Sequence, residues 1–443
     1  MISNMEDIPS INNQIDAIIN TIFQRGVKQN FVPGKSHVKY AGMVFDKEEI
    51  HASIKALISS FSNNWFAVGP FANEFQKKLS SYLGLKKTVF VNSGSSANLI
   101  SVATLFAKNK IRRGNEAITL ATTFPTTINP LLIYGLKTVL IDIDLPSYTA
   151  NLKQLEDAIS DKTKMILIPH INGSSNDMKQ IMELAEKHDL AVVEDCCDAL
   201  GSKFGGKMVG TFGDLGTYSF YAAHHMSTGE GGAVGSNDEE LIQTAESIRD
   251  WGRVNLKLAT GETRKINLQN VSKELPKDYE DRYTYINIGY NLKPLDMQAA
   301  IGLQQLEKLG KFNLQRKQNY KFLFENLSEF NDKLILPEGL PKADPSWFVF
   351  PITIKRNTGF KRLDIIRFLE KKNIGTRSLL AGDITRHPAY QGIKFRKIGK
   401  LSTSKEILEN SFVIGVYHGL GKEELEYIVE CFKNFFKNFA QLQ

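Results

Sequence analysis

The sequence predicts an α/β protein with a large, mostly parallel sheet and a smaller α+β part toward the C-terminus. From residue 85 to 236, short β-branched runs alternate with stretches of helical periodicity. These runs are apolar throughout, which is typical of strands buried on both faces of a sheet. The 443 residues, of which 42% are hydrophobic, supply enough apolar material for a large core.

The N-terminal residues predict helices. Apolar side chains recur at helical spacing from Ile15 to Phe23 and precede Gly26, so we expect a short amphipathic helix that packs on the body. A second helix is expected around His51–Ser62, and the aromatic, Gly/Pro-rich stretch Trp65–Phe71 is typical of a loop. Seven strands of the sheet are then predicted at Thr88–Val91, Ala117–Leu120, Thr138–Ile143, Met165–Ile168, Leu190–Glu194, Thr217–Phe220 and Gly232–Gly235.

Helices are predicted between the strands and after them. A long helix beginning at Pro294–Leu309 is expected to bridge two domains, and the polar stretch Gly252–Asp281 predicts a long loop. The other predicted elements are helices at Ala97–Ala107, Asp177–Lys187, Asp238–Trp251, Leu363–Lys372 and Glu423–Phe439, and a strand at Phe348–Ile354. We expect three parts: a helical extension (1–60), a large α/β domain (61–310) and a small α+β domain (311–443).

The charges do not predict a nucleic-acid-binding protein. The net charge of +7 is spread over the chain, with lysine and acidic residues interleaved. A mildly positive surface suits an anionic small substrate, although a surplus of solvated lysines explains it as well.

The cysteines and the N-terminus predict a cytoplasmic location without a membrane segment. Cys196, Cys197 and Cys431 form no spaced disulfide framework. The N-terminus is polar and acidic where a signal peptide is basic and then apolar, and no apolar run reaches about 18 residues.

The stretch VNSGSSAN (91–98) leaves a predicted strand and enters a predicted helix. Its small residues and free N–H groups suit a phosphate, but a serine helix cap explains the pattern equally well. Neither the GKS at 34–36 nor the glycine-rich run at 229–234 completes a P-loop or a dinucleotide fingerprint.

Asp195 closes an apolar strand, which places it at the carboxyl edge of the sheet, where ligands of such folds collect. An aspartate there can keep a pyridine nitrogen protonated, so that the ring acts as an electron sink. The alternative is an ordinary helix cap.

The segment 217–234 leads from a strand through His224 and His225 into a glycine-rich turn and another strand. Adjacent histidines are poor joint metal ligands, and no HExxH or Cys/His spacing accompanies them, so no metal site is expected. A histidine here is either a proton carrier or a packed structural residue.

These motifs resemble the sugar aminotransferase and dehydratase family of pyridoxal-phosphate enzymes, of the DegT type. The resemblance covers residues 40–440 and rests on six motifs in the family's order: SGSSAN, TTFPTTINP (122–130), EDCCDALGSK (194–203), SFYAAHH…GEGG (219–232), DWGR (250–253) and GYNLKPLDMQAAIGLQQL (289–306). It implies the aspartate-aminotransferase-like fold (fold type I) and a cofactor, pyridoxal or pyridoxamine 5′-phosphate.

One substitution changes the implied chemistry. The family's Schiff-base lysine lies five residues after the strand serine, Ser219, and His224 occupies that position here, with no lysine between 208 and 256. Imidazole cannot form that covalent link. The resemblance therefore implies a non-covalently held pyridoxamine phosphate, as in the nucleotide-sugar 3-dehydratases, which remove the C3 hydroxyl of 4-keto-6-deoxyhexoses and which also match in TRSLLAGDITRHP (376–388).

The resemblance also implies roles for other residues. Asp195 would pair with the ring nitrogen, Asp198 would orient the ring hydroxyl and Phe124 would stack on the ring. The remaining roles are His224 as base; Ser95, Ser96 and Ser219 on the phosphate; Asn291 on the cofactor phosphate of a neighbouring subunit in a homodimer; and His225, Arg377 and Arg386 toward the sugar nucleotide. His225 is equally well explained as a structural residue, and the two arginines as surface ion pairs.

One departure concerns iron–sulfur chemistry. CDP-sugar members of this branch carry a cluster on cysteines, and those positions align here with Cys197, Asn255, Lys257 and Lys265. One thiolate cannot hold a cluster. We therefore expect the cluster-free route, in which glutamate restores the cofactor amine, and we expect Cys196 and Cys197 to be core residues. Two alternatives stay open: a sugar aminotransferase that retains His224, and a non-catalytic cofactor-binding protein.

Overall fold

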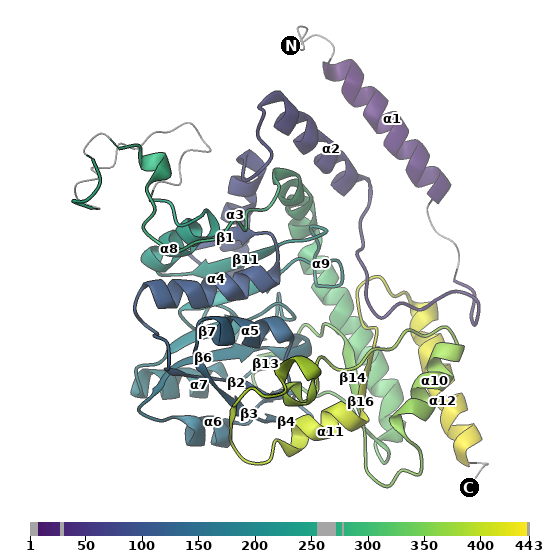
Figure 1. Ribbon diagram of the computed structural model, residues 1–443. Helices are drawn as coiled ribbons and strands as arrows, with labels where there is room; N and C mark the ends of the chain where they lie inside the picture. The colour runs from purple at the N-terminus through teal and green to yellow at the C-terminus, as the bar shows by residue number, and fades with distance from the viewer. Residues whose placement is uncertain (1–7, 27–30, 255–271, 277–278, 441–443) are drawn as a thin grey trace.

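An eight-stranded sheet with the order β1-β11-β10-β7-β6-β2-β3-β15 forms the centre of the computed structural model (Figure 1). The structure describes residues 8–26, 31–254, 272–276 and 279–440. Its strands are β1 (Lys87–Val91), β2 (Glu116–Leu120), β3 (Lys137–Ile141), β6 (Thr163–Pro169), β7 (Ala191–Asp195), β10 (Leu215–Ser219), β11 (Gly232–Ser236) and β15 (Arg396–Lys397). Within the sheet, only β11 runs against its neighbours.

The seven predicted strands are present, with two differences. The predicted strand Thr138–Ile143 ends at Ile141, and Ile143–Asp144 (β4) pairs instead with Thr149–Ala150 (β5). The eighth strand, β15, comes from the C-terminal part of the chain and pairs with β3. A two-residue strand leaves no periodic pattern, which is why the prediction of seven strands missed it.

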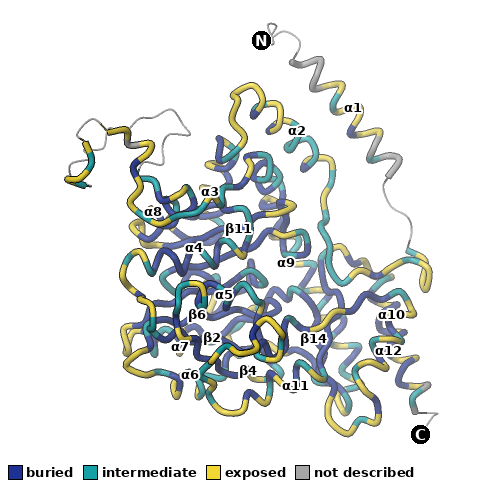
Figure 2. Tube along the Cα trace, in the orientation of Figure 1, coloured by how far each residue is buried: buried dark blue, intermediate teal, exposed yellow. Residues whose placement is uncertain are grey.

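Both faces of the sheet are buried, as the apolar strands predict. Val89 and Val91 pack on one face, and Phe90 packs on the other. The first face is covered by α4 (Gly94–Ala107) and α8 (Glu239–Arg249), and the second by α3 (Pro70–Leu83) and α9 (Asp296–Leu327). Figure 2 shows the buried residues concentrated in the strands and in the sheet-facing sides of these helices.

Several helices begin where the sequence supplies a cap. Ser93 caps α4, while Asp177 and Asp238 cap α7 and α8. The prediction of a loop over Trp65–Phe71 is wrong at its end, because Gly69 is the N-cap of α3 and Pro70 its first residue. The remaining helices of this part are α5 (Pro125–Ile133), α6 (Leu152–Ala158) and α7 (Met178–Lys187).

Helix α9 connects the large sheet to the C-terminal part. Leu303 and Leu309 pack with α3, whereas Leu323 and Leu327 join the core that surrounds a three-stranded sheet. That sheet has the order β12 (Leu334–Ile335), β14 (Phe350–Ile354) and β16 (Ser411–Ile414), with α10 (Arg362–Lys371), α11 (Ser402–Asn410) and α12 (Lys422–Ala440) nearby (Figure 1). A third small sheet joins β8 (Lys203–Phe204), β9 (Lys207–Met208) and β13 (Ala343–Asp344). The proposed domain boundaries at 60 and 310 stay predictions.

The N-terminal extension contains both predicted helices, α1 (Ile8–Gly26) and α2 (Lys47–Ser62). Helix α1 lies at the periphery beside α2, and α2 packs on α9 (Figure 1). On α1, the side chain of Ile19 is buried whereas that of Ile18 is exposed. Among the described residues, no helix combines the length and the apolar character that crossing a bilayer requires.

Candidate active site

Three strand ends bring predicted site residues to the carboxyl edge of the sheet. Asp195 ends β7, Ser219 ends β10, and Gly94 begins α4 directly after β1. The order β1-β11-β10-β7 places these ends close together. A Cβ atom built on Gly94 would lie 2.5 Å from the Cβ of Ser219 and 2.8 Å from the Sγ of Cys197. The sheet thus brings together residues that are more than 120 positions apart in the sequence.

The Asp195 carboxylate is held by three donors. Its Oδ2 accepts hydrogen bonds from Asn98 Nδ2 at 2.8 Å and from Thr127 Oγ1 at 2.7 Å. Its Oδ1 accepts one from the backbone N–H of Cys197 at 3.2 Å. Asn98 is itself fixed by Thr217, whose hydroxyl donates to Asn98 Oδ1 at 2.7 Å. These bonds orient the carboxylate at the strand end.

The N-terminus of α4 lies beside this carboxylate. The Ser93 hydroxyl accepts a hydrogen bond from the N–H of Ser96 at 3.0 Å and lies 2.9 Å from the Ser96 hydroxyl. Ser95 donates to Thr126 Oγ1 at 3.0 Å. Ser93 caps the helix, as the helix-cap interpretation predicts. The hydroxyls of Ser95 and Ser96 lie at the positive end of this helix, and their contact with a phosphate stays a prediction.

Phe124 lies shortly after the end of β2 and is 54% exposed, although it immediately precedes α5. A loop from the C-terminal part is attached beside it. The N–H of Ala381 donates to the carbonyl of Thr123 at 3.3 Å, and that of Ile384 donates to Ala121 at 3.0 Å. The loop that carries the motif 376–388 is therefore a wall of the same sheet edge.

His224 follows β10 and is nearly buried, with 14% of its side chain exposed. Its Nδ1 lies 3.6 Å from Oδ1 of Asp198, and its ring lies 4.9 Å from the Phe348 ring, tilted by 30°. Burial and, to a smaller extent, the nearby charge of Arg316 together lower the pKa of His224 to about 3. The imidazole is therefore neutral at physiological pH and can accept a proton.

Asp198 is the acidic partner of His224. Burial raises the pKa of Asp198 to about 7, the negative charge of Asp195 adds to the rise, and a hydrogen bond from the backbone of Asn172 opposes it. Near neutral pH this carboxyl group is thus close to its titration midpoint, as suits a group that gains and loses a proton.

His225 lies in the packed interior rather than at the site. Its side chain is fully buried, and its Nε2 donates to the carbonyl of Ser346 at 2.7 Å. The structure favours the interpretation of His225 as a structural residue.

Within one chain, the remaining predicted residues lie apart from Asp195, Ser219 and His224. Asn291 is exposed and its backbone pairs with Asp250. Arg377 is exposed, with its guanidinium 4.6 Å above the Tyr40 ring, and Arg386 lies 3.4 Å from the carboxylate of Asp383. Arg386 belongs to the loop that borders the sheet edge, whereas the backbone of Arg377 pairs with that of Val413 in β16.

Cys197 lies beside the start of α4 and is only partly buried, in contrast to the expectation of a core residue. Burial raises its pKa well above the ordinary value, and Asp195 raises it further. A protonated thiol is a poor ligand for iron. The aligned positions Asn255, Lys257 and Lys265 lie outside the described residues. Cys196 is fully buried, as expected.

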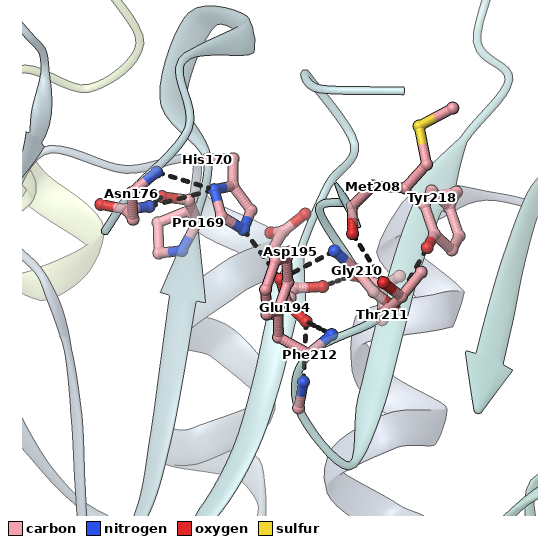
Figure 3. Close-up of polar contacts among 12 residues, drawn as sticks. Pro169, His170, Asn176, Glu194, Asp195, Met208, Gly210, Thr211, Phe212 and Tyr218 are labelled. Carbon is pink, nitrogen blue, oxygen red and sulfur yellow. Dashed lines mark hydrogen bonds and ion pairs between the residues drawn. The ribbon is translucent and has the colours of Figure 1, made fainter. Parts of the chain in front are cut away.

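A second polar cluster lies below Asp195 and is explained by internal hydrogen bonds (Figure 3). The buried Glu194 accepts hydrogen bonds from the N–H groups of Gly210, Phe212 and Gly213 at 2.7, 2.7 and 2.8 Å. Its Oε2 also lies 3.2 Å from His170 Nε2. His170, Glu194 and Cys196 are close enough to share a metal ion, but Glu194 already has these donors. The cluster supports the strand that carries Asp195.

Sequence reasoning missed four residues that shape the site. Asn98 and Thr127 lie within motifs that were singled out, so their place in SGSSAN and TTFPTTINP was an available signal. Phe348 and Arg316 had none: Phe348 lies at the start of a predicted strand, and Arg316 lies in the long helix predicted to begin at Pro294–Leu309, where no local pattern distinguishes it.

The donor set fits pyridoxamine or pyridoxal phosphate. A fixed carboxylate at the strand end suits a pyridine nitrogen, and hydroxyls at a helix N-terminus suit a phosphate. The Nδ1 of His224 is a buried ring nitrogen without a hydrogen-bond partner. An exposed aromatic ring, Phe124, stands at the same edge. Fold and site together define a pyridoxal-phosphate enzyme of the aminotransferase-fold class.

The chain belongs to the DegT/DnrJ/EryC1/StrS aminotransferase family, whose model matches residues 47–433. It is 41% identical, over 92% of its length and 93% of the relative, to the lipopolysaccharide biosynthesis protein RfbH of Salmonella typhimurium. It is 38% identical, over 97% and 93%, to a dTDP-4-dehydro-2,6-dideoxy-D-glucose 3-dehydratase of Saccharopolyspora spinosa.

A solved structure shows the same fold. The crystal structure of a GDP-4-keto-6-deoxymannose-3-dehydratase with a trapped PLP-glutamate geminal diamine has a TM-score of 0.79 at 27% identity, covering 89% of this chain and 99% of that one. The predicted family, fold and cofactor are confirmed: the protein is a sugar-modifying enzyme that uses pyridoxal or pyridoxamine phosphate.

Proposed function

We propose that the protein is a nucleotide-sugar 3-dehydratase, a lyase that removes the C3 hydroxyl from a nucleotide-linked 4-keto-6-deoxyhexose without an iron–sulfur cluster. The observation that carries this proposal is His224, a neutral imidazole at the site edge in the position where the resemblance implies a lysine. Two related proteins, at 38% and 27% identity, are named as 3-dehydratases of such sugars.

The chain would hold the cofactor without a covalent bond. When bound, pyridoxamine phosphate supplies an amine for the 4-keto group and a ring that stores electrons. Asp195 would contact the ring nitrogen, Phe124 one ring face and Asp198 the ring hydroxyl. Ser95, Ser96 and Ser219 would donate to the phosphate at the end of α4.

His224 would move the protons of the reaction. Its imidazole is neutral, so a ring nitrogen can accept the proton, and the protonated ring can then return that proton to a departing hydroxyl. A base that cannot bind the cofactor covalently leaves the amine available for the sugar.

The substrate side involves the loop wall and a second copy of the chain. Arg386 and Arg377 carry exposed guanidinium groups suited to a diphosphate. Asn291 would reach the cofactor phosphate of a partner subunit in a homodimer, which agrees with its exposed position away from Asp195. The similarity to RfbH supports a role in deoxysugar biosynthesis for a surface polysaccharide such as an O-antigen. The unpaired cysteines support a cytoplasmic reaction.

Glutamate would be the amino donor. For each turnover, the sugar loses one oxygen atom while glutamate becomes 2-oxoglutarate and ammonia, which balances atoms and electrons. A sugar aminotransferase, the second candidate that the family description favours, would leave the nitrogen on the sugar and release no ammonia.

The test combines the purified protein, pyridoxamine phosphate and glutamate with CDP-, GDP- and dTDP-linked 4-keto-6-deoxy sugars. Mass spectrometry of the products and an ammonia assay give the result. A sugar that loses oxygen without gaining nitrogen, with one ammonia per turnover, supports the proposal. A nitrogen-containing sugar supports the aminotransferase, and no reaction with any substrate favours the non-catalytic alternative.

A further inference from the structure

A buried arginine lies behind His224 without an acidic partner. The Arg316 side chain is fully buried on α9, and no carboxylate of the described chain forms an ion pair with it. Its Nε has no hydrogen-bond partner. Burying a cation is costly unless other groups solvate it, so its partners need an explanation.

Those partners are three backbone carbonyl groups. Nη2 donates to the carbonyl of His224 at 3.1 Å, and Nη1 donates to those of Phe348 at 2.9 Å and Trp347 at 3.4 Å. One rigid, planar group therefore joins the turn that carries the base to the segment whose aromatic ring faces the base.

These contacts are part of a group of neighbouring segments that surround the imidazole. The N–H of Phe348 donates to the carbonyl of Asn172 at 2.7 Å, and the Asn172 backbone lies near enough to Asp198 to oppose the rise in the pKa of that carboxyl group. Asp198 in turn faces His224 Nδ1 at 3.6 Å. Together with the Arg316 contacts, these residues bring the segments that follow β6, β7 and β10 next to the segment before β14.

We propose that Arg316 is a positioning residue for the reaction: its guanidinium fixes the backbone of His224 against the Phe348 segment and thereby sets where the imidazole points. This inference rests on the proposed role of His224 as the base. The charged and titratable groups around the site are Asp195, Asp198, Cys197, His225, His418 and Tyr417, besides Arg316 itself. The Arg316 charge lowers the pKa of all three histidines, which agrees with its central place.

The test compares Arg316→Lys and Arg316→Gln with a matched control, Arg362→Lys. Lysine keeps the charge but cannot span three carbonyl groups, whereas glutamine loses the charge as well. Arg362 is likewise an arginine that donates to a backbone carbonyl, that of Ser411 at 3.2 Å, but it lies on α10. The readouts are kcat and KM for the nucleotide sugar, and the ¹⁵N resonances of the His224 ring in the cofactor-free protein, assigned with His224→Gln.

We expect Arg316→Lys to lower kcat at least about tenfold, with KM within about twofold of wild type, because a misplaced base impairs chemistry more than substrate binding. The His224 ring resonances should shift in both Arg316 variants, and in Arg316→Gln the ring should titrate at higher pH. Arg362→Lys should change neither readout.

Unchanged kcat and unchanged His224 resonances in Arg316→Lys would overturn the proposal, as would a kcat loss that leaves those resonances as in wild type. If Arg316→Gln fails to fold, Arg316→Lys decides alone. If the wild-type protein shows no dehydration, the resonances still test the positioning, so failure of the proposed function is distinguishable from failure of this inference.

Discussion

The imidazole Nδ1 of His224 lies 3.6 Å from Oδ1 of Asp198 in a largely buried corner of the sheet edge. Burial acts on the two groups in opposite directions, lowering the pKa of His224 to about 3 and raising that of Asp198 to about 7. At neutral pH the contact therefore joins a neutral imidazole to a carboxyl group near its midpoint, rather than two full charges. Of the two groups, the carboxyl group therefore holds a proton more readily than the imidazole does.

Asp198→Asn should change how stability depends on pH. The folded state raises the pKa of Asp198 from 3.8 to about 7, so the folded protein binds more protons than the unfolded chain between these values. The stabilisation by this carboxyl group is complete below pH 3.8 and is lost as pH rises through 7. A neutral asparagine avoids that loss, and we expect the cofactor-free variant to gain on the order of 2–4 kcal/mol over wild type at pH 8 and almost nothing at pH 4.

Urea unfolding of the cofactor-free proteins at several pH values measures this difference. Comparing both proteins at each pH cancels the titration of His224, which overlaps the same range. Asp161→Asn, at an exposed position, serves as the control and should show no such trend. A stability difference between wild type and Asp198→Asn that stays constant from pH 4 to 8 would contradict the assigned burial of Asp198.

His224→Lys should restore a covalent link to pyridoxal phosphate. The residue lies at the sheet edge beside Asp198, and a lysine amine there can form the Schiff base that imidazole cannot. Borohydride reduction followed by peptide mass mapping should place the cofactor on residue 224 in the variant, while wild-type protein loses it on dialysis. Dehydration should fall about 10²–10⁴-fold, with transamination appearing in its place. Efficient trapping of pyridoxal phosphate on a site lysine of the wild type would count against the account.

The sequence was sufficient to predict the sheet and much of its carboxyl edge. Buried parallel strands are apolar runs, and a residue at the end of such a strand has a known place, which is how Asp195 is assigned to the carboxyl edge. The role of Ser219 comes from the family resemblance instead. The serine-cap interpretation of 91–98 is confirmed by Ser93, although the helix begins at Gly94 rather than at the predicted Ala97.

Other features depend on contacts that no local pattern records. Arg316 lies in the predicted long helix, but its partners are backbone carbonyls from distant segments, which helical periodicity does not record. Phe348 was assigned to a strand, because an aromatic residue ahead of alternating apolar residues is typical of one, whereas β14 begins two residues later. Helix α3 was missed because Gly-Pro is common in loops as well as at helix starts.

Gly94→Ala should weaken cofactor binding through a steric effect. A Cβ there would lie 2.5 Å from the Cβ of Ser219 and 2.8 Å from Cys197 Sγ, so the end of α4 would have to move away from β10. We expect a loss of about 1–3 kcal/mol in the free energy of unfolding. The Kd of pyridoxamine phosphate should rise at least about tenfold.

Fluorescence titration with pyridoxamine phosphate measures the Kd for wild type and for Gly94→Ala, with Gly310→Ala as the control. Gly310 lies in α9 with nothing near its would-be Cβ, so alanine there should stabilise the protein by about 0.5–1 kcal/mol and leave the Kd unchanged. Equal Kd values for Gly94→Ala and wild type would show that the end of α4 is not part of the phosphate site.

The position of solvent hydrogen in the product tests the central claim most directly. Wild-type protein is incubated in ²H₂O with pyridoxamine phosphate, glutamate and the active nucleotide sugar, and the product is examined by NMR. Dehydration places deuterium on C3 and leaves a keto group at C4, which is the result the account predicts. Deuterium on C4 beside a new amine, with the C3 hydroxyl intact, would contradict it.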